Sequence, residues 1–245
     1  QEMRDTMALL WWRLQAVRDT RQRNFTAALS SLRAAAGYRH GTQGSAKNGA
    51  DDVHFAKALL LLRDNVHHRS KIERAYRKAI GEARQEIIIA NAYFVPGRKL
   101  RRALKMAAQR GVKVQLLLQG KYEYFMQYHA ARPVYGALLA AGVEIYEYSA
   151  SFLHAKVAVV DGRWVTVGSS NLDPLSLLLA REANVVVNDA GFAADLRGRL
   201  VRAMENGGQR VDAAQYAGRP WRQRLRDRIA FGLMRAALFV TGYRY

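Results

Sequence analysis

The stretch LHAKVAVVDGRWVTVGSSNLDP, residues 153–174, decides how this chain is interpreted. Two short apolar runs flank the dipeptide Asp161-Gly162, which is typical of a tight turn between paired strands. We therefore predict a strand at 154–160 and a second strand at 163–168. Polar residues recur along this hairpin and just beyond it, which a purely structural hairpin does not require.

The polar residues of this stretch suit one kind of chemistry. His154 and Lys156 are two residues apart, so in a strand their side chains share a face. An imidazole can attack or transfer a proton near neutral pH, and the ammonium adds a fixed positive charge. Ser169 and Asn171 add hydrogen-bond donors after the second strand, and the whole set suits a phosphoryl group. Asp161 opens the turn, where we predict a structural carboxylate that accepts from backbone N–H groups.

Composition narrows the classes of function. The 245-residue chain carries a formal net charge of +19, which attracts a polyanion, either nucleic acid or an anionic membrane. Cysteine is absent, which excludes disulfides, thiolate metal sites and a cysteine nucleophile. No apolar run approaches the roughly 20 residues that span a bilayer, and no signal peptide is visible. Because the chain opens at Gln1 within a helical pattern, we expect a fragment or a processed product.

The chain divides by pattern into four segments. We expect a helical connector at 1–40, a flexible linker at 41–52, an α/β lobe at 53–210 and a basic amphipathic tail at 211–245. Within the lobe, short apolar runs alternate with amphipathic stretches. Strands are predicted at 58–62, 86–90, 112–118, 143–148 and 183–187, and helices at 70–84, 100–109, 133–141 and from Asp189 to about 206. This alternation predicts a layered α/β domain whose largely parallel sheet is closed by the antiparallel hairpin.

Other groups of residues leave alternatives open. In the tail, four apolar residues step along one helical face: Trp221, Leu225, Ile229 and Leu233. This face either lies in a lipid interface or packs on its own domain or a neighbour. The basic run at 98–105 is either a solvated face or a contact for anionic head groups. Tyr93, Phe94 and Pro96 either line a substrate mouth or belong to ordinary strand-to-helix packing, and the residues at 121–125 either contact the lipid or cover the sheet.

The spaced residues also carry a family resemblance. The set that resembles the HKD motif of the phospholipase D superfamily is His154, Lys156, Asp161, Gly168, Ser169 and Asn171. The resemblance spans about 55–210 and is strongest to the C-terminal half of bacterial cardiolipin synthases, through NAYFVPG at 91–97, RGVKVQLLLQG at 110–120 and the continuation to 187. It implies a phospholipase D-like α/β/α domain with a mostly parallel mixed sheet. It also implies that Glu182 is the acidic partner of the His154 imidazole.

The resemblance further implies an activity. The family mechanism is a two-step phosphodiester exchange through a phosphohistidine, with no metal or other cofactor. A cardiolipin synthase of this type joins two phosphatidylglycerols into cardiolipin and releases glycerol. His154, in the second lobe, would be the general acid and base. The implied partners are phosphatidylglycerol and a membrane surface, in preference to nucleic acid. The implied location is peripheral, on the cytoplasmic face of a bacterial inner membrane.

The chain departs from the family in having one motif where the chemistry requires two. His54 and Lys57 have the wrong spacing, and 67–69 lacks the lysine and the Gly-Ser pair. Three explanations remain open: a missing N-terminal lobe, which we favour, pairing of two copies, or an inactive product.

Two further functions remain as alternatives to the transferase. One is a single-motif, metal-independent phosphodiesterase or nuclease that acts as a dimer. The other is an inert fragment whose arginine-rich ends bind lipid.

Overall fold

A computed structural model describes residues 57–63, 70–121, 125–173 and 181–240. The predicted connector at 1–40 and linker at 41–52 lie outside these ranges. The described residues belong to one compact unit that begins at Ala56. Its strands and helices alternate along the chain in this order: β1 (Lys57–Arg63), α3 (Lys71–Glu82), β2 (Glu86–Asn91), α4 (Arg98–Gln109), β3 (Lys113–Gln119), α5 (Phe125–Leu139), β4 (Glu144–Tyr148), β5 (Lys156–Val160), β6 (Trp164–Gly168), β7 (Glu182–Asn188), α7 (Ala190–Gly207), β8 (Gly208–Arg210), α8 (Ala213–Ala217) and α9 (Trp221–Val240).

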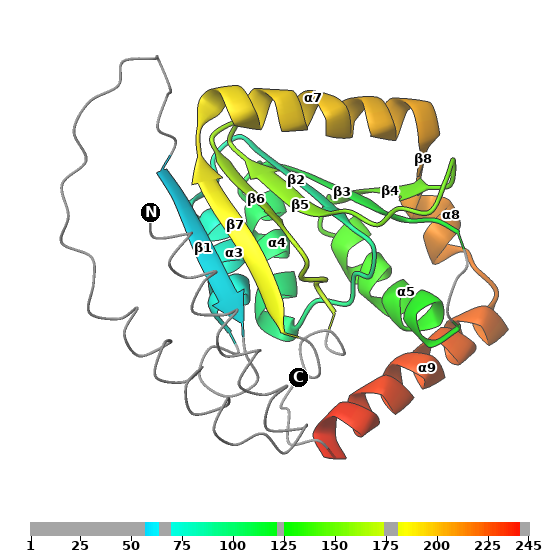
Figure 1. The fold of residues 1–245 in the computed structure, drawn as a ribbon. Coiled ribbons are helices and arrows are strands. Elements are labelled where there is room, and N and C mark those ends of the chain that lie inside the picture. The colour runs from blue at the N-terminus through cyan, green and yellow to red at the C-terminus, as the bar shows by residue number, and fades with distance from the viewer. Residues whose placement is uncertain (1–56, 64–69, 122–124, 174–180, 241–245) are drawn as a thin grey trace, which may run out of the picture. The chain divides into compact units, whose positions relative to one another are not determined.

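The strands form one mixed sheet in the order β1-β7-β6-β5-β2-β3-β4-β8 (Figure 1). The layered α/β class is confirmed, but the balance of the sheet differs from the expectation. Of the described neighbours, β2–β3 and β3–β4 are parallel, and the other five pairs are antiparallel. Parallel pairs form where a helix crosses over between strands, whereas the tight turn at Asp161-Gly162 can only join antiparallel strands. The pairing of β5 with β2 and of β1 with β7 is not visible in the sequence.

Helices cover both faces of the sheet. Helices α3, α4 and α5 pack on one face and α7 packs on the other (Figure 1). Alternate residues of β2 serve the two layers: Ile87 and Ile89 belong to the larger core cluster, and Ile88 to the cluster beneath α7. This explains the consecutive apolar residues at 87–90 in β2 and at 116–118 in β3, since a strand buried on both faces has no solvent side.

Several helix boundaries follow local signals. Gly111, with φ of 88°, ends α4 in the left-handed region, where glycine carries no Cβ penalty. The Asp189 side chain accepts a hydrogen bond of 2.7 Å from the N–H of Phe192 and so caps α7, as predicted.

Helix α5 differs from the prediction, because it begins at Phe125 and contains Pro133 in its interior. Its first half packs against α9, and this tertiary contact outweighs the hydrogen bond that proline removes.

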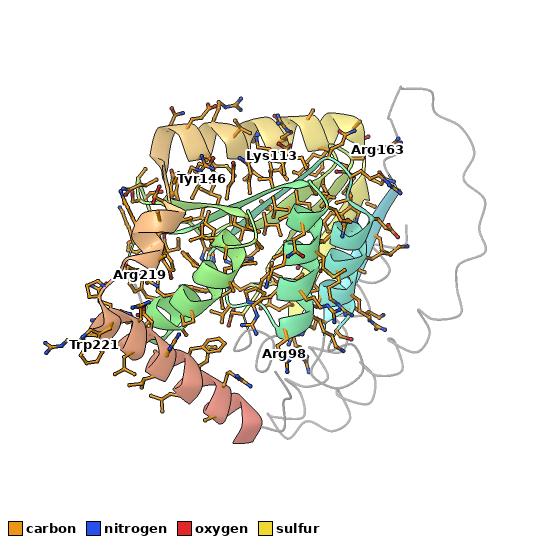
Figure 2. All side chains as sticks on the ribbon, turned by 180° about the vertical axis from the view of Figure 1, so that it is seen from behind. Arg98, Lys113, Tyr146, Arg163, Arg219 and Trp221 are labelled. Atoms are coloured by element: carbon orange, nitrogen blue, oxygen red, sulfur yellow. The ribbon has the colours of Figure 1, made fainter. Side chains whose placement is uncertain are left out.

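Helix α9 uses two opposite faces. Asp227, Ala230 and Met234 are buried against the domain, where α9 packs on α5. The predicted apolar stripe instead faces outward, with exposed fractions of 63, 48, 53 and 59% for Trp221, Leu225, Ile229 and Leu233. Figure 2 labels Trp221 at the start of this helix, away from the sheet. Across the described ranges, no helix is both long enough and apolar enough to cross a membrane.

Candidate active site

The predicted site residues gather at one edge of the sheet. Strand β2 ends at this edge with Asn91, and β5 begins there because it runs antiparallel to β2. Strand β6 returns to the same edge with Gly168, and β7 starts from it at Glu182. The topology therefore brings together four of the predicted residues that are distant in sequence: His154, Ser169, Asn171 and Glu182.

His154 and Lys156 are presented differently. The His154 side chain is exposed just before β5, whereas Lys156 is only 6% exposed at the first position of that strand. The Lys156 ammonium donates a hydrogen bond of 3.2 Å to the His154 carbonyl oxygen. This contact fixes the cation beneath the residue that carries the imidazole. The imidazole is thus exposed and the ammonium is fixed by a backbone contact, and the catalytic roles of these two side chains stay predictions.

A row of four paired residues runs across the sheet at this edge, and three of them, Asn91, Lys156 and Asn184, have buried polar side chains. Asn91 pairs with Lys156, and Gly168 pairs with Asn184. The β5–β6 register places Lys156 and Gly168 in neighbouring positions, so the four residues share one face. A Cβ atom on Gly168 would lie 2.4 Å from the Asn184 side chain and from the Ala183 carbonyl oxygen. The glycine of the motif therefore makes room for Asn184.

Ser169 and Glu182 form a hydrogen-bonded pair. The Ser169 hydroxyl donates to the Glu182 carboxylate, and it accepts a hydrogen bond of 3.0 Å from the N–H of Ala183. Glu182 is buried. Within the described part of the chain, no hydrogen bond joins Glu182 to the His154 ring. The role of Glu182 as partner of the imidazole stays a prediction, and its contact in the structure orients Ser169.

The loop that carries Asn171 is tied to the loop after β2. The N–H of Leu172 donates to Asn91 Oδ1 at 3.1 Å, and the N–H of Val95 donates to the Leu172 carbonyl at 2.9 Å. These bonds hold the buried Asn171 at the edge. Sequence reasoning missed Asn91. Its signal is a lone polar residue that ends a strand of consecutive apolar residues, where an apolar residue would otherwise continue the core.

Asp161 lies at the other end of β5 and does not join the site. Its carboxylate accepts hydrogen bonds of 2.8, 2.9 and 3.0 Å from the N–H groups of Arg84, Gln85 and Glu86. Burial alone would raise the pKa of Asp161, but these three N–H donors outweigh it and hold the pKa below its ordinary value. Its φ of 49° is one that aspartate tolerates in a turn. The carboxylate thus clamps the hairpin turn to the start of β2.

A pocket opens next to the His154 segment, on the face covered by α5. It connects to that segment through Gln119, whose Oε1 accepts a hydrogen bond of 3.1 Å from the N–H of Leu153. The polar and aromatic residues that line it are Tyr93, Phe94, Gln119, Lys121, Tyr128, Arg132 and Tyr135. Of the residues predicted to contact the substrate, Tyr93, Phe94 and Lys121 line this pocket. Within the described ranges, no three histidine, aspartate or glutamate side chains come together as a metal site.

Arg132 supplies a fixed charge in this pocket. Its guanidinium lies 2.7 Å from Glu147 Oε1 and 4.2 Å from the centre of the Tyr128 ring. Burial alone would lower the pKa of Arg132, but Tyr135 and Glu147 outweigh it and raise the pKa. The side chain therefore remains cationic at any physiological pH. A cation stacked on tyrosine and paired with a carboxylate has its orientation fixed before a ligand arrives.

Comparison with known proteins identifies this architecture. The mixed sheet with helices on both faces resembles the solved structure of Nuc from Salmonella typhimurium, a phospholipase D family member, with a TM-score of 0.54 and 22% identity over 64% of this chain and 98% of that one. It also resembles phosphatidylserine synthase from Haemophilus influenzae, with a TM-score of 0.57 and 10% identity over 90% of this chain and 53% of that one. The fold is therefore that of a phospholipase D-like domain.

The sequence comparison is more specific. Residues 76–204 match the family model described as "Cardiolipin synthase, PLD-like domain". Cardiolipin synthase B of Salmonella typhi is 44% identical over 188 residues, which cover 77% of this chain and 46% of that protein. The chain belongs to the family of cardiolipin synthase, phospholipase D-like domains. It spans about half the length of curated relatives such as cardiolipin synthase B of Salmonella typhi and of Escherichia coli.

Proposed function

We propose that this chain is the second catalytic lobe of a cardiolipin synthase-type phosphatidyltransferase. One observation carries the proposal. The exposed His154 is followed two residues later by the buried Lys156, whose ammonium donates to the His154 carbonyl oxygen, in a chain that is 44% identical over 188 residues to a cardiolipin synthase B. The substrates are two phosphatidylglycerols, and the products are cardiolipin and glycerol.

The reaction proceeds in two displacements at phosphorus. In the first, an imidazole nitrogen of one histidine attacks the phosphodiester of phosphatidylglycerol, a nitrogen–phosphorus bond forms, and the bond from phosphorus to the head-group glycerol oxygen breaks. The second histidine donates its proton to that oxygen, and glycerol leaves. In the next displacement this histidine removes the proton from a hydroxyl of another phosphatidylglycerol. That oxygen attacks phosphorus, and the nitrogen–phosphorus bond breaks. His154 takes the second role.

The neighbours of His154 stabilise the charge that develops on the phosphoryl oxygens. Lys156 is held by the His154 carbonyl, so its charge is in place before the substrate arrives. Asn171 supplies a side-chain amide donor from a loop that the hydrogen bonds to Asn91 and Val95 keep at the edge, whereas the Ser169 hydroxyl already donates to Glu182. Preorganised donors of this kind need no rearrangement as charge builds up, and each contributes about 3 kcal/mol to transition-state stabilisation.

The chemistry needs a second histidine beyond His154. We infer that a first lobe supplies it, because this chain covers 46% of the length of cardiolipin synthase B of Salmonella typhi. A second copy of the chain is the alternative. The Nuc chain favours that alternative, since the likeness covers 98% of it and a single lobe therefore makes up a whole chain in this superfamily. That arrangement would suit a metal-independent phosphodiesterase or nuclease.

The exposed face of α9 supports a membrane as a partner of this chain. Its outward apolar stripe lies opposite the face that packs on α5, and arginines flank the stripe on both sides, with Arg222 and Arg226 on one flank and Arg224 and Arg228 on the other. This arrangement suits a helix that lies in the interface of an anionic bilayer. We infer a peripheral association with the cytoplasmic face of a bacterial inner membrane.

A lipid assay tests the proposal. Vesicles of phosphatidylglycerol are incubated with the purified chain alone and with the chain plus the amino-terminal half of cardiolipin synthase B, and lipids are separated by thin-layer chromatography. We expect cardiolipin and free glycerol with both halves present, and none after His154→Ala. Absence of product in both mixtures would contradict the proposal.

Two further measurements distinguish the two-lobe transferase from a pair of identical copies and from a nuclease. Activity of the chain alone, together with a dimer in sedimentation velocity, would favour pairing of two copies. Cleavage of labelled DNA in the presence of EDTA, abolished by His154→Ala, would favour the nuclease. In that case we expect no cardiolipin from either mixture.

A further inference from the structure

A groove lies between α4, α5 and α9. Helix α5 contributes residues both to this groove and to the pocket beside His154, but no single residue lines both. Helix α4 contributes four cations to the groove: Arg98, Arg101, Arg102 and Lys105. Their spacing of three and four residues places them on one face of the helix. Figure 2 shows Arg98 at the end of α4 that lies toward α9.

The charges in this groove are not balanced. None of its lining residues is acidic. Among the described residues, Arg98, Arg102 and Lys105 form no ion pair with any carboxylate. The first turn of α4 also contains no acidic residue, so its cations oppose the helix dipole. Four like charges on one helical face repel one another, and an anion in the groove would offset this repulsion.

The floor of the groove is apolar. Met106, Val134, Leu138 and Phe231 contribute to it from three different helices. The Phe231 ring lies 5.6 Å from the guanidinium carbon of Arg101 and 6.0 Å from that of Arg235. These cation–π contacts hold positive charge over an apolar surface. One wall of the groove is therefore cationic and the floor is hydrocarbon.

We propose that this groove binds an anionic phospholipid outside the catalytic centre. The phosphodiester meets the guanidinium groups of α4, whose planar forks match phosphate oxygens, and an acyl chain lies on the apolar floor. The apolar floor favours a lipid over a soluble phosphate, because only a lipid has an acyl chain that would cover Met106 and Phe231. This site is independent of the catalytic role proposed for His154. It would give the protein a second hold on the same class of lipid that the reaction consumes.

Calorimetry with short-chain lipids tests the site. The probes are dihexanoyl phosphatidylglycerol below its micelle concentration, dihexanoyl phosphatidylcholine and inorganic phosphate. The test variant is Arg98→Gln/Arg102→Gln. The matched control is Arg74→Gln/Lys78→Gln, which removes two exposed cations with the same spacing from α3. We expect the groove variant to lose about tenfold in phosphatidylglycerol affinity, the control to bind like the parent chain, and phosphatidylcholine and phosphate to bind more weakly.

Stability provides a second readout. Removing cations from the start of α4 relieves repulsion, so we expect the melting temperature of the groove variant to be unchanged or higher. A separate variant, Met106→Gln, should weaken phosphatidylglycerol binding and leave phosphate binding unchanged.

Three results would overturn the site. They are equal affinity of the groove variant and the control, equal affinity for phosphatidylcholine, and phosphate binding as tight as lipid binding. All of these readouts measure binding, so a failure of the transferase proposal would leave this test unaffected.

Discussion

Gly168 and Asn184 face each other on neighbouring strands β6 and β7, so closely that a Cβ atom on Gly168 would lie 2.4 Å from the Asn184 side chain. The Asn184 amide donates a hydrogen bond of 3.1 Å to Thr166 Oγ1, and its oxygen lies 3.4 Å from the N–H of Ser170 as an acceptor. The glycine of the motif thus makes room for the buried Asn184 at the same edge of the sheet as the candidate site.

Replacing this glycine should destabilise the fold. Gly168→Ala forces Asn184 and the backbone of Ala183 apart, and we expect a loss of about 2 kcal/mol in the free energy of unfolding. Urea denaturation measures the change. The control is Gly81→Ala in α3, where a Cβ meets nothing within 4 Å and should be neutral or stabilising. Equal midpoints for Gly168→Ala and the parent chain would refute the packing argument.

Removing the charge of Asp161 should make stability less dependent on pH. Asp161→Asn tolerates the same turn but accepts fewer hydrogen bonds from residues 84–86, so we expect a loss of about 1 kcal/mol at pH 7. The folded-state pKa of Asp161 is depressed. The carboxylate therefore stabilises the fold fully above the unfolded-state pKa, at about pH 4, and progressively less as the pH falls through the folded-state pKa. Thermal melts between pH 7 and pH 3 should show the difference between variant and parent shrinking, and a constant difference would contradict the assignment.

Removing the imidazole of His154 should abolish turnover and leave the fold intact. The side chain is exposed, so His154→Ala removes little packing. General acid–base catalysis by one group contributes about 10²–10⁴-fold, and we expect a loss in that range for cardiolipin formation in the two-lobe assay. The melting temperature checks the fold. A variant that melts normally and still makes cardiolipin at the parent rate would remove His154 from the mechanism.

A buried carboxylate on α9, that of Asp227, joins this helix to α5 through a hydrogen bond. His129 Nδ1 lies 2.8 Å from Asp227 Oδ1, and Arg219 lies 3.1 Å from the other oxygen of that carboxylate. Asp227→Ala takes the carboxylate away from both side chains, so we expect a loss of about 3 kcal/mol and faster tryptic cleavage in the arginine-rich α9. The control is Asp195→Ala, which removes an exposed pair with Arg199 and should cost less than about 0.5 kcal/mol. Equal cleavage of the two variants would argue against this anchor.

The outward face of α9 should control membrane binding. Ile229→Glu places a charge in the middle of the apolar stripe, and we expect at least a several-fold drop in flotation with phosphatidylglycerol vesicles. The matched control is Phe192→Glu on α7, since the two parent side chains are 53% and 42% exposed. If both variants lose binding equally, net charge accounts for the effect. If binding is unchanged in both, α9 faces another occupant, such as the first lobe.

The sequence predicted local features well, because local contacts create them. The apolar run around Ile88, the cap at Asp189 and the left-handed Gly111 each depend on a few neighbouring residues. The predicted start of α5 was wrong, because contacts between residues far apart in the sequence determine where this helix begins. Pro133 looks like the first residue of a helix, but the contacts of the preceding half with α9 extend it. The short β8 was not predicted, since it exists by pairing with β4.

Some residues of the candidate site could likewise be predicted from the sequence, and others were found only in the structure. The spacing of His154, Lys156 and Ser169 was enough to indicate a phosphoryl site, since a strand turns alternate side chains to one face. The structure added Asn91 and Asn184, and it confirmed that Asp161 is a turn residue that accepts from backbone N–H groups.

By itself, the sequence determined most of the segments that become strands and helices and indicated the candidates for the chemistry, because periodicity, turns and caps are encoded within a few residues. Only the tertiary structure decided the order and direction of the strands, the buried row beneath the site and the separation of α9 into an inner and an outer face. These features depend on pairings between residues far apart in the chain, and their free energy arises only when the whole domain packs together.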